Sequence, residues 1–262
     1  MRSSIPNAKR IVVKVGTSTL THDNGTINLV RMDKLARILS DLVNQGKQII
    51  LVSSGAIAVG VNKLKMTERP KTTPAKQAAA AVGQSELMHL YAKFFSEYGH
   101  IVAQVLLTKD VVETQPQRTN VINTFDNLLS SAIIPIVNEN DTVATDEIEF
   151  GDNDTLSALV ATLVDANLLI LLSDIEGLYD ADPHKHPQAK LIPTVEAITP
   201  AIIALAGGAG STRGTGGMAT KIKAAKIATQ AHIAMIITDG SKPENLIPLL
   251  EGQAIGTFFK PV

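Results

Sequence analysis

The chain has 262 residues, of which 45% are hydrophobic and only 3% aromatic, and its formal net charge is −1. This length and aliphatic composition fit one large α/β domain, or two modest lobes, with a substantial core. The balance of 24 basic against 25 acidic residues does not indicate nucleic-acid binding through a basic field, and the absence of cysteine excludes disulfides, thiolate catalysis and cysteine metal sites.

Apolar runs rich in Val, Ile and Leu alternate with segments of helical spacing along the chain. Strands are predicted, in chain order, at residues 11–15, 48–53, 101–107, 133–138, 168–173, 232–238 and 254–259. Helices are predicted around residues 35–43, 87–95, 121–131 and 155–164. Strands that alternate with helices indicate βαβ crossovers. The predicted fold class is therefore α/β, with helices around a mostly parallel open sheet.

No segment is predicted to direct the chain to a membrane. The N-terminal region lacks the apolar core of a signal peptide. The longest apolar stretch, residues 159–172, is interrupted by Asp165 and is shorter than the ~18 residues that a membrane span requires. We therefore expect a soluble, cytoplasmic protein.

Lys14 is the first candidate functional residue, because it lies inside an apolar strand and just before Gly16. In open parallel sheets, ligands bind beyond the carboxyl ends of the strands, where this lysine is placed. Burial of an unpaired ammonium group is costly. Lys14 is therefore either a functional cation or an edge-strand lysine whose head group reaches solvent, and its local context leaves both open.

A turn of small residues, Ser54-Gly55-Ala56, follows the second predicted strand. Backbone N–H groups at a strand-to-helix turn can bind a carboxylate or a phosphate. Taken by itself, such a turn is more often a plain tight turn.

Two clusters of acids and amides follow, Asn-Glu-Asn-Asp at residues 138–141 and Gly-Asp-Asn-Asp at residues 151–154. Acidic side chains this close repel one another unless they hold a cation, an ammonium group or a lysine. Asp154 is also predicted to cap the helix that starts there. Neither cluster matches an EF-hand loop, so no dedicated calcium site is predicted.

The glycine-rich segment from Gly214 to Lys221 precedes another helix. A glycine-rich loop, a helix N-terminus and a lysine together indicate a phosphate-binding site. The segment is neither a Walker A loop nor a dinucleotide-binding fingerprint. Because glycine-rich loops are common, the segment by itself does not establish a phosphate-binding site.

The order of these clusters resembles that of the glutamate 5-kinases within the amino-acid kinase family. The similar strings are KVGTS, SSGAIAVG, NENDTVAT, GDNDTLSA, LLSDIEGLYDADP and GTGGMATK, between Ile11 and about Phe259. The resemblance implies the amino-acid kinase fold, a three-layer α-β-α sandwich, as a single domain of residues 1–262. Approximately residues 1–165 would form the acid-substrate lobe, and residues 166–262 the nucleotide-binding lobe.

The resemblance also implies a role for each matching residue. Lys14 and Lys221 would contact the transferred phosphoryl group, and Asp154, the third catalytic residue, would orient both lysines. The acid substrate would be bound by Ser54, Gly55, Ala56, Asp141, Asp152 and Asn153. ATP would be bound by Lys14, Ser173, Asp174, Gly214, Thr215, Gly216, Gly217, Met218 and Lys221, while Mg²⁺ would be carried by ATP rather than by a protein metal site.

The implied reaction is the ATP-dependent phosphorylation of the L-glutamate side-chain carboxylate to L-glutamyl 5-phosphate plus ADP, the first step of proline biosynthesis. A side-chain carboxylate is already ionised at pH 7, so this chemistry needs alignment and charge neutralisation rather than a general base. The implied partners are L-glutamate, ATP and, as a possible feedback inhibitor, proline. A homodimer or homotetramer is expected, with no nucleic-acid or membrane partner.

Two departures from the resemblance affect these expectations. Long members of the family carry an extra C-terminal domain similar to RNA-modification modules, whereas this chain stops at Val262. We therefore expect a short form, in which the missing domain would bear on regulation and assembly more than on catalysis. Position 173 is Ser where the family more often has Thr, a change that keeps the hydroxyl group.

Other readings within and outside the family stay open at this point. Aspartokinases have a similar opening lysine motif but usually append regulatory domains. N-acetylglutamate kinases and uridylate kinases share the fold but open with different glycine patterns. A sensor that binds an amino acid without turnover is the alternative from another class, although a sensor would not need Lys14, Lys221 and Asp154.

Overall fold

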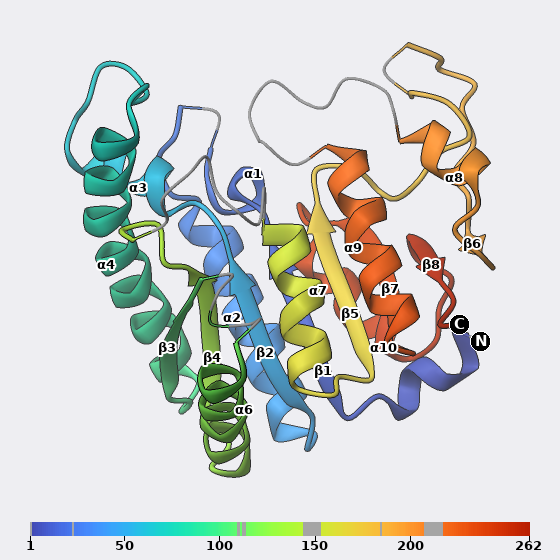
Figure 1. Ribbon diagram of the computed structural model, residues 1–262, viewed down its shortest axis with the longest axis horizontal. Helices are drawn as coiled ribbons and strands as arrows, with labels where there is room; N and C mark the ends of the chain where they lie inside the picture. Colours follow the sequence, from blue (N-terminus) through green and yellow to red (C-terminus); the bar gives the residue numbers. More distant parts are fainter. Residues whose placement is uncertain are drawn as a thin grey trace.

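The computed structural model describes residues 2–22, 24–108, 111, 114–143, 153–183, 185–206 and 217–262. Its strands form a single sheet (Figure 1). Most of them begin and end within one or two residues of the apolar runs in the sequence, because uninterrupted Val, Ile and Leu suit strands that are buried on both faces. The strands are β1 Arg10–Val15, β2 Gln48–Ser53, β3 Val102–Leu107, β4 Ile134–Glu139, β5 Leu168–Ser173, β6 Thr194–Val195, β7 Ala234–Asp239 and β8 Thr257–Phe259.

The strand order is β3-β4-β2-β1-β5-β7-β8-β6, and the six strands from β3 to β7 run parallel. β8 pairs antiparallel with β7 and parallel with β6. The mostly parallel sheet is therefore confirmed. The short β6 was not predicted, because a two-residue strand leaves no periodic signal. A strand was predicted at residues 254–259, but the antiparallel direction of β8 was not, because an apolar run does not indicate strand direction.

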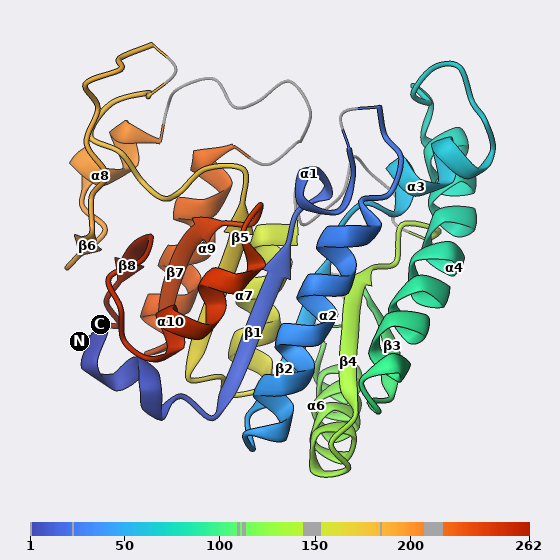
Figure 2. The same cartoon turned by 180° about the vertical axis from the view of Figure 1, so that it is seen from behind.

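Helices cover both faces of this sheet, as the two opposite views in Figures 1 and 2 show. Residues of α2, α3, α4 and α10 share one core cluster with the sheet, and residues of α6, α7 and α9 share the other. The three-layer α-β-α architecture is thus confirmed. The helices are η1 Arg2–Asn7, α1 Thr17–Leu20, α2 Leu29–Asn44, α3 Ala56–Lys63, α4 Thr73–Glu97, α6 Gln115–Ser130, α7 Asn153–Leu163, α8 Pro200–Leu205, α9 Met218–Gln230, η2 Pro243–Asn245 and α10 Leu246–Leu250.

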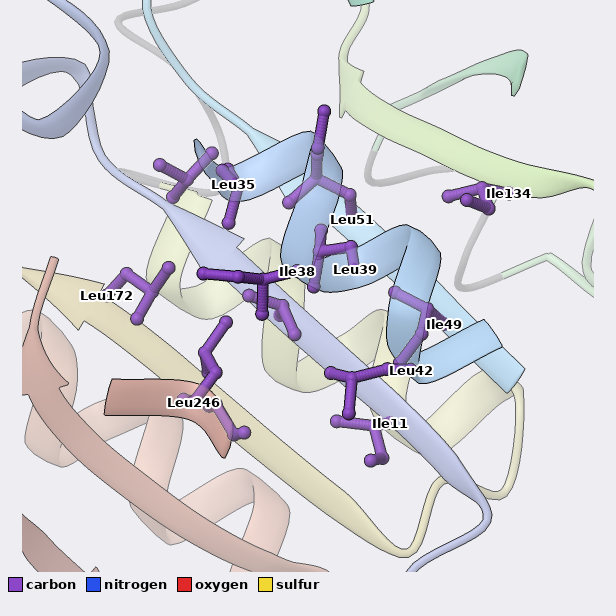
Figure 3. Close-up of a cluster of buried hydrophobic side chains, with 14 of the residues drawn as sticks. Ile11, Leu35, Ile38, Leu39, Leu42, Ile49, Leu51, Ile134, Leu172 and Leu246 are labelled. Atoms are coloured by element: carbon purple, nitrogen blue, oxygen red, sulfur yellow. The ribbon is translucent and has the colours of Figure 1, made fainter. Parts of the chain in front are cut away.

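The two cores are separated by the alternation of side chains along β1. Ile11 and Val13 pack into the core on the α2 side, whereas Val12 packs into the core on the α7 and α9 side. Figure 3 shows the first of these cores, in which one apolar stripe of α2 lies on the sheet. The stripe consists of Leu35, Ile38, Leu39 and Leu42, spaced three or four residues apart as an amphipathic helix requires.

The helices α3 and α4 pack so closely that their backbones meet at two glycines. A Cβ atom on Gly60 would lie 1.8 Å from the carbonyl oxygen of Ala79, and one on Gly83 would lie 1.8 Å from the carbonyl oxygen of Ala56. Any larger residue would therefore force the two helices apart. Because Ala56 is the first residue of α3, the contact at Gly83 fixes the point where the chain leaves β2 and enters α3.

The topology places a switch point at the carboxyl ends of β1 and β5. From β1 the chain crosses through α2 to β2 on one side, and from β5 it proceeds through α9 to β7 on the other side. Such a switch point is where open α/β sheets bind their ligands. Within the described part of the chain, every helix is too short or too polar to cross a lipid bilayer.

Candidate active site

Lys14 lies at the carboxyl end of a central strand. Its neighbours in the sheet are Val52 of β2 and Leu171 of β5, so β1 is not an edge strand. The residue is only 8% exposed, and its Nζ is 2.6 Å from Oδ1 of Asp154. The alternative that Lys14 reaches solvent from an edge strand is therefore wrong.

A second lysine contacts the same carboxylate from another helix. Lys221, in the first turns of α9, is 5% exposed, and its Nζ is 3.1 Å from Oδ2 of Asp154. Thr220 donates a hydrogen bond of 3.0 Å to the same oxygen from its hydroxyl group. Asp154 itself has no exposed surface. The sheet and two helices thus bring together residues that are 207 positions apart in sequence (221 − 14).

The charges of this cluster determine the protonation of Asp154. Burial by itself would raise the pKa of this carboxyl group, but the charges of Lys14 and Lys221 and the hydrogen bonds from both outweigh that effect. The net result is a pKa below the usual range of aspartate, so Asp154 is ionised at any pH near neutrality. Together the three side chains carry two positive charges and one negative charge.

Asp154 is not at the position predicted for it in its helix. Helix α7 begins at Asn153, so Asp154 lies in the first turn rather than at the N-cap, and its carboxylate faces the two lysines. The cap prediction followed from residue type alone, which does not reveal that two ammonium groups lie within contact distance. Ser157 donates a 2.6 Å hydrogen bond to the carbonyl oxygen of Asp154, within the same helix.

Asn153 connects the start of α7 to the ends of two strands. Its side-chain nitrogen, Nδ2, is 2.7 Å from the carbonyl oxygen of Ser53, 3.0 Å from Oγ of Ser54 and 2.9 Å from Oδ1 of Asn138. An amide nitrogen has only two protons, so these three acceptors occupy all of its donor capacity. The amide oxygen of Asn153 is left to accept hydrogen bonds.

Asn138 and Gln84 extend this network, although neither was assigned to the site from the sequence. Asn138 is 2% exposed and donates from its side chain to Oε1 of Gln84 at 2.8 Å, while its own Oδ1 accepts from the backbone N–H of Glu139 at 2.9 Å. The acid and amide cluster at residues 138–141 did mark Asn138 for attention. Gln84 lies in the middle of α4, and no local signal distinguishes it from any other helical glutamine.

The turn after β2 opens α3 with a glycine in the left-handed region. Gly55 has a φ of 98°, a conformation that glycine adopts without strain, and it occupies the N-cap position of α3. Ala56 is the first residue of the helix, and first-turn N–H groups have no partner inside their own helix. The structure therefore places the turn of Ser54, Gly55 and Ala56 beside Asn153, where the first N–H groups of α3 begin.

Asp141 lies in the turn that follows β4 and is half-buried. Burial raises the pKa of its carboxyl group to about 6. A carboxylate that is costly to ionise in the free protein gains from a cationic ligand, because the opposite charge offsets the lost hydration.

The carboxyl ends of β5 and β7 lie on the other side of the switch point. Ser173, at the end of β5, is paired in the sheet with Asp239 and donates a 3.1 Å hydrogen bond to Oδ1 of the exposed Asp174. Gly217 occupies the N-cap position of α9 and Met218 begins the helix, one turn before Lys221. Asp152, Gly214, Thr215 and Gly216 lie outside the described residues, so their predicted roles are not tested.

Comparison with known proteins identifies the family. The model of the amino acid kinase family matches residues 9–239. The chain belongs to the amino acid kinase family. Among its relatives in that family, the glutamate 5-kinase of Clostridium perfringens is 58% identical over 99% of this chain and 98% of its own length, and that of Listeria monocytogenes is 56% identical over 99% of this chain and 95% of its own length. The resemblance seen in the motifs is thus confirmed.

Solved structures share the amino acid kinase fold at much lower identity. The carbamate kinase from Giardia lamblia bound to AMP-PNP has a TM-score of 0.68 and 15% sequence identity, and it covers 97% of this chain and 99% of its own. The UMP kinase from Bacillus anthracis has a TM-score of 0.65 and 13% identity, over 97% of this chain and 96% of its own. At such identities the likeness concerns the fold alone.

No part of the described chain brings together three or more His, Asp or Glu side chains in a group that could hold a metal ion.

Removing the charge of Asp154 tests the ion cluster. Asp154→Asn leaves two buried ammonium groups without their carboxylate, and we expect the free energy of unfolding at pH 7 to fall by about 3–5 kcal/mol, measured by urea denaturation. Because the folded-state pKa lies below the usual range, the contribution of the carboxylate is present above the unfolded-state pKa of about 3.9 and is lost only at more acidic pH. The difference from the parent protein should therefore stay constant between about pH 5 and pH 8.

Asp126→Asn is the matched control, because Asp126 pairs with Arg10 at 3.3 Å on the surface. An exposed pair of this kind contributes about 0–1 kcal/mol. An equal decrease in the free energy of unfolding in the two variants would show that the buried cluster contributes no more to stability than a surface ion pair.

Proposed function

We propose that this chain transfers the γ-phosphoryl group of ATP to the side-chain carboxylate of L-glutamate, producing L-glutamyl 5-phosphate and ADP, as the first step of proline biosynthesis. The observation that carries the proposal is the buried Lys14–Asp154–Lys221 cluster next to the Asn153–Ser54 contact at the strand ends. It is supported by the names of the relatives, which are glutamate 5-kinases at 55–58% identity over nearly the whole chain.

The proposed chemistry is a direct displacement at phosphorus. An oxygen of the glutamate side-chain carboxylate forms a bond to the γ-phosphorus while the bond from that phosphorus to the β,γ-bridging oxygen breaks, and ADP leaves. No proton moves, because the attacking carboxylate is ionised at pH 7. Catalysis then depends on alignment and on positive charge near the oxygens that accumulate negative charge.

Lys14 and Lys221 would supply that positive charge, and Asp154 would hold both ammonium groups in place. Their contacts of 2.6 Å and 3.1 Å to one carboxylate keep the two cations close together despite their repulsion. Such preorganised charge needs no rearrangement when the phosphoryl group moves. Mg²⁺ is expected to enter with ATP, since hard cations bind phosphate oxygens, and it would neutralise further charge on the nucleotide.

The acid substrate would lie between the turn after β2 and the start of α7. The N–H groups of Gly55 and Ala56 suit a carboxylate of glutamate, because helix N-termini bind anions. The carboxylate of Asp141 and the amide oxygen of Asn153 suit its ammonium group. Ser54 would contribute its hydroxyl, and Asp152 is included on the basis of its motif alone.

ATP would lie on the opposite side of the ion cluster. Ser173 and Asp174 at the end of β5, and Gly217 and Met218 at the start of α9, would line its site together with the motif residues Gly214, Thr215 and Gly216. The single domain would then divide into an acid-substrate lobe of about residues 1–165 and a nucleotide lobe of residues 166–262. Inhibition by proline, assembly into a homodimer or homotetramer, and a cytoplasmic location remain predictions from the family.

A panel of acceptors tests the proposed function. ADP release is measured with L-glutamate, L-aspartate, N-acetyl-L-glutamate and UMP, and hydroxylamine is used to trap an acyl phosphate. We expect turnover and a hydroxamate with L-glutamate. Turnover with another acceptor and none with L-glutamate would overturn the assignment, and binding of an amino acid without any ADP release would favour a sensor.

Substitution of either lysine tests the phosphoryl-transfer role. Lys14→Ala and Lys221→Ala each remove one preorganised cation, and we expect kcat to fall about 10²–10³-fold in steady-state ADP release. Lys223→Ala is the control, because Lys223 is exposed on the same helix as Lys221. A near-normal kcat in either test variant would remove that lysine from the mechanism.

The pH dependence of glutamate binding tests Asp141. Its pKa of about 6 means that the carboxylate needed to bind an ammonium group is lost as the pH falls through 6. We expect KM for L-glutamate to be about tenfold higher at pH 5 than at pH 8, since about one tenth of the carboxyl group is then ionised. In Asp141→Asn the KM should be high and independent of pH over this range.

KM for ATP, measured in the same series, separates this effect from titration of the nucleotide. An unchanged pH profile in Asp141→Asn would contradict the assignment of the pH dependence to this residue.

A further inference from the structure

We propose that Tyr91 is a positioning residue for the acid substrate, acting through Ser53 to fix the peptide unit between Ser54 and Gly55. The inference rests on the proposed function, because it concerns the turn to which the acid substrate is assigned. The hydroxyl group of Tyr91 forms its hydrogen bond with Ser53, the residue before that turn. Its effect passes through one buried hydroxyl group.

Tyr91 brings a hydroxyl group into the interior of the protein. The residue lies in α4, is 1% exposed and has its ring centroid 6.4 Å from that of Phe95. Its hydroxyl oxygen is 2.8 Å from Oγ of Ser53, which is itself 2% exposed. Burial raises the pKa of Tyr91 well above its usual range, so the hydroxyl keeps its proton at any pH at which the enzyme would work.

The hydrogen bonds have a direction. Oγ of Ser53 donates to the carbonyl oxygen of Ser54 at 3.2 Å. A hydroxyl group has only one proton to donate, so when Ser53 donates it to Ser54, Tyr91 is the donor to Ser53. The order is then Tyr91 to Ser53 to the carbonyl group of Ser54.

That carbonyl group and the N–H of Gly55 belong to the same planar peptide unit. Fixing the direction of the carbonyl oxygen therefore fixes the direction of the N–H group, which points the opposite way. Gly55, with its φ of 98°, leaves this peptide unit freer to rotate than any other residue would. A hydrogen bond that selects one orientation consequently has a larger effect on the direction of this peptide unit than it would have inside a helix or a strand.

The N–H and the hydroxyl group of Ser54 are held independently of Tyr91. The N–H of Ser54 donates to the carbonyl oxygen of Val15 at 3.1 Å, and Asn153 contacts both Ser53 and Ser54. Rotation of the Ser54–Gly55 peptide is the freedom that these contacts do not remove. Loss of the Tyr91 hydroxyl should thus disturb one backbone donor while the turn stays in place.

Helix α4 contacts the part of the site assigned to the acid substrate at two further points. Gly83 abuts the first turn of α3, and Gln84 accepts from Asn138, the partner of Asn153. Tyr91 lies on the same helix, two turns beyond Gly83. α4 therefore supports the turn assigned to the acid substrate from behind, although it is not among the elements that hold the three catalytic residues.

The test combines Tyr91→Phe, Ser53→Ala and the double variant. Tyr91→Phe removes only the hydroxyl and keeps the ring in the core. We expect KM for L-glutamate to rise about 3- to 10-fold in each single variant, the size of effect that one hydrogen bond typically has, while KM for ATP stays within about twofold. Because both residues act through one relay, KM for L-glutamate in the double variant should be no higher than in the single variant with the higher KM.

Tyr98→Phe is the matched control. Tyr98 follows α4 as its C-cap residue, and its hydroxyl donates to Oδ1 of Asp33 at 2.9 Å, away from the turn after β2. We expect its loss to leave both KM values unchanged. A lower melting temperature with an unchanged KM for L-glutamate in Tyr91→Phe would show a purely structural hydroxyl and overturn the proposal.

Ser53→Ala keeps the proposal testable even where Tyr91→Phe folds poorly, since it breaks the same relay without touching the aromatic core. Additive effects in the double variant would also overturn the proposal, because independent residues add. Failure of the positioning role proposed for Tyr91 is distinguishable from failure of the proposed function. If the parent protein phosphorylates another acid, the same KM comparison is made with that acid.

Discussion

The contact of Lys14 and Lys221 with the single carboxylate of Asp154 is the interaction on which the rest of this active site depends. Charges this deeply buried are tolerated only when each is compensated at close range. The three residues come from a central strand and from two helices on one face of the sheet. Sheet register and helix packing must therefore both be correct before the cluster can form.

The two faces of the sheet contribute differently to the site. The face with α7 and α9 supplies the charged residues, whereas the face with α3 and α4 supplies the small-residue turn and the support behind it. Polar contacts between Asn153, Asn138 and Ser54 join the two at the strand ends. The fold is shared with solved structures at 15% and 13% identity, so the architecture alone does not define what a particular member binds.

Much of the fold followed from the sequence, because buried parallel strands and amphipathic helices have different hydrophobic periods. The runs at residues 11–15, 48–53 and 168–173 became β1, β2 and β5 with almost unchanged limits. A strand was predicted at residues 254–259, but its antiparallel direction as β8 did not follow from the sequence, and neither did the two-residue β6, since both depend on which neighbouring strand is met. Nor did the close approach of α3 and α4, because a glycine inside a helix does not reveal what lies against it.

For the candidate site, the sequence alone determined the set of motif residues and, through their order, the family. Two of its ambiguities were decided only by the tertiary structure. Lys14 could have been a solvated edge lysine until its strand was placed between β2 and β5, and Asp154 could have been a helix cap until both lysines were found beside it. Thr220 belonged to the glycine-rich motif but was given no role. Gln84 and Tyr91 had no sequence signal as site residues, because a hydrogen bond such as that between Tyr91 and Ser53, 38 residues apart, depends on packing and leaves no local pattern.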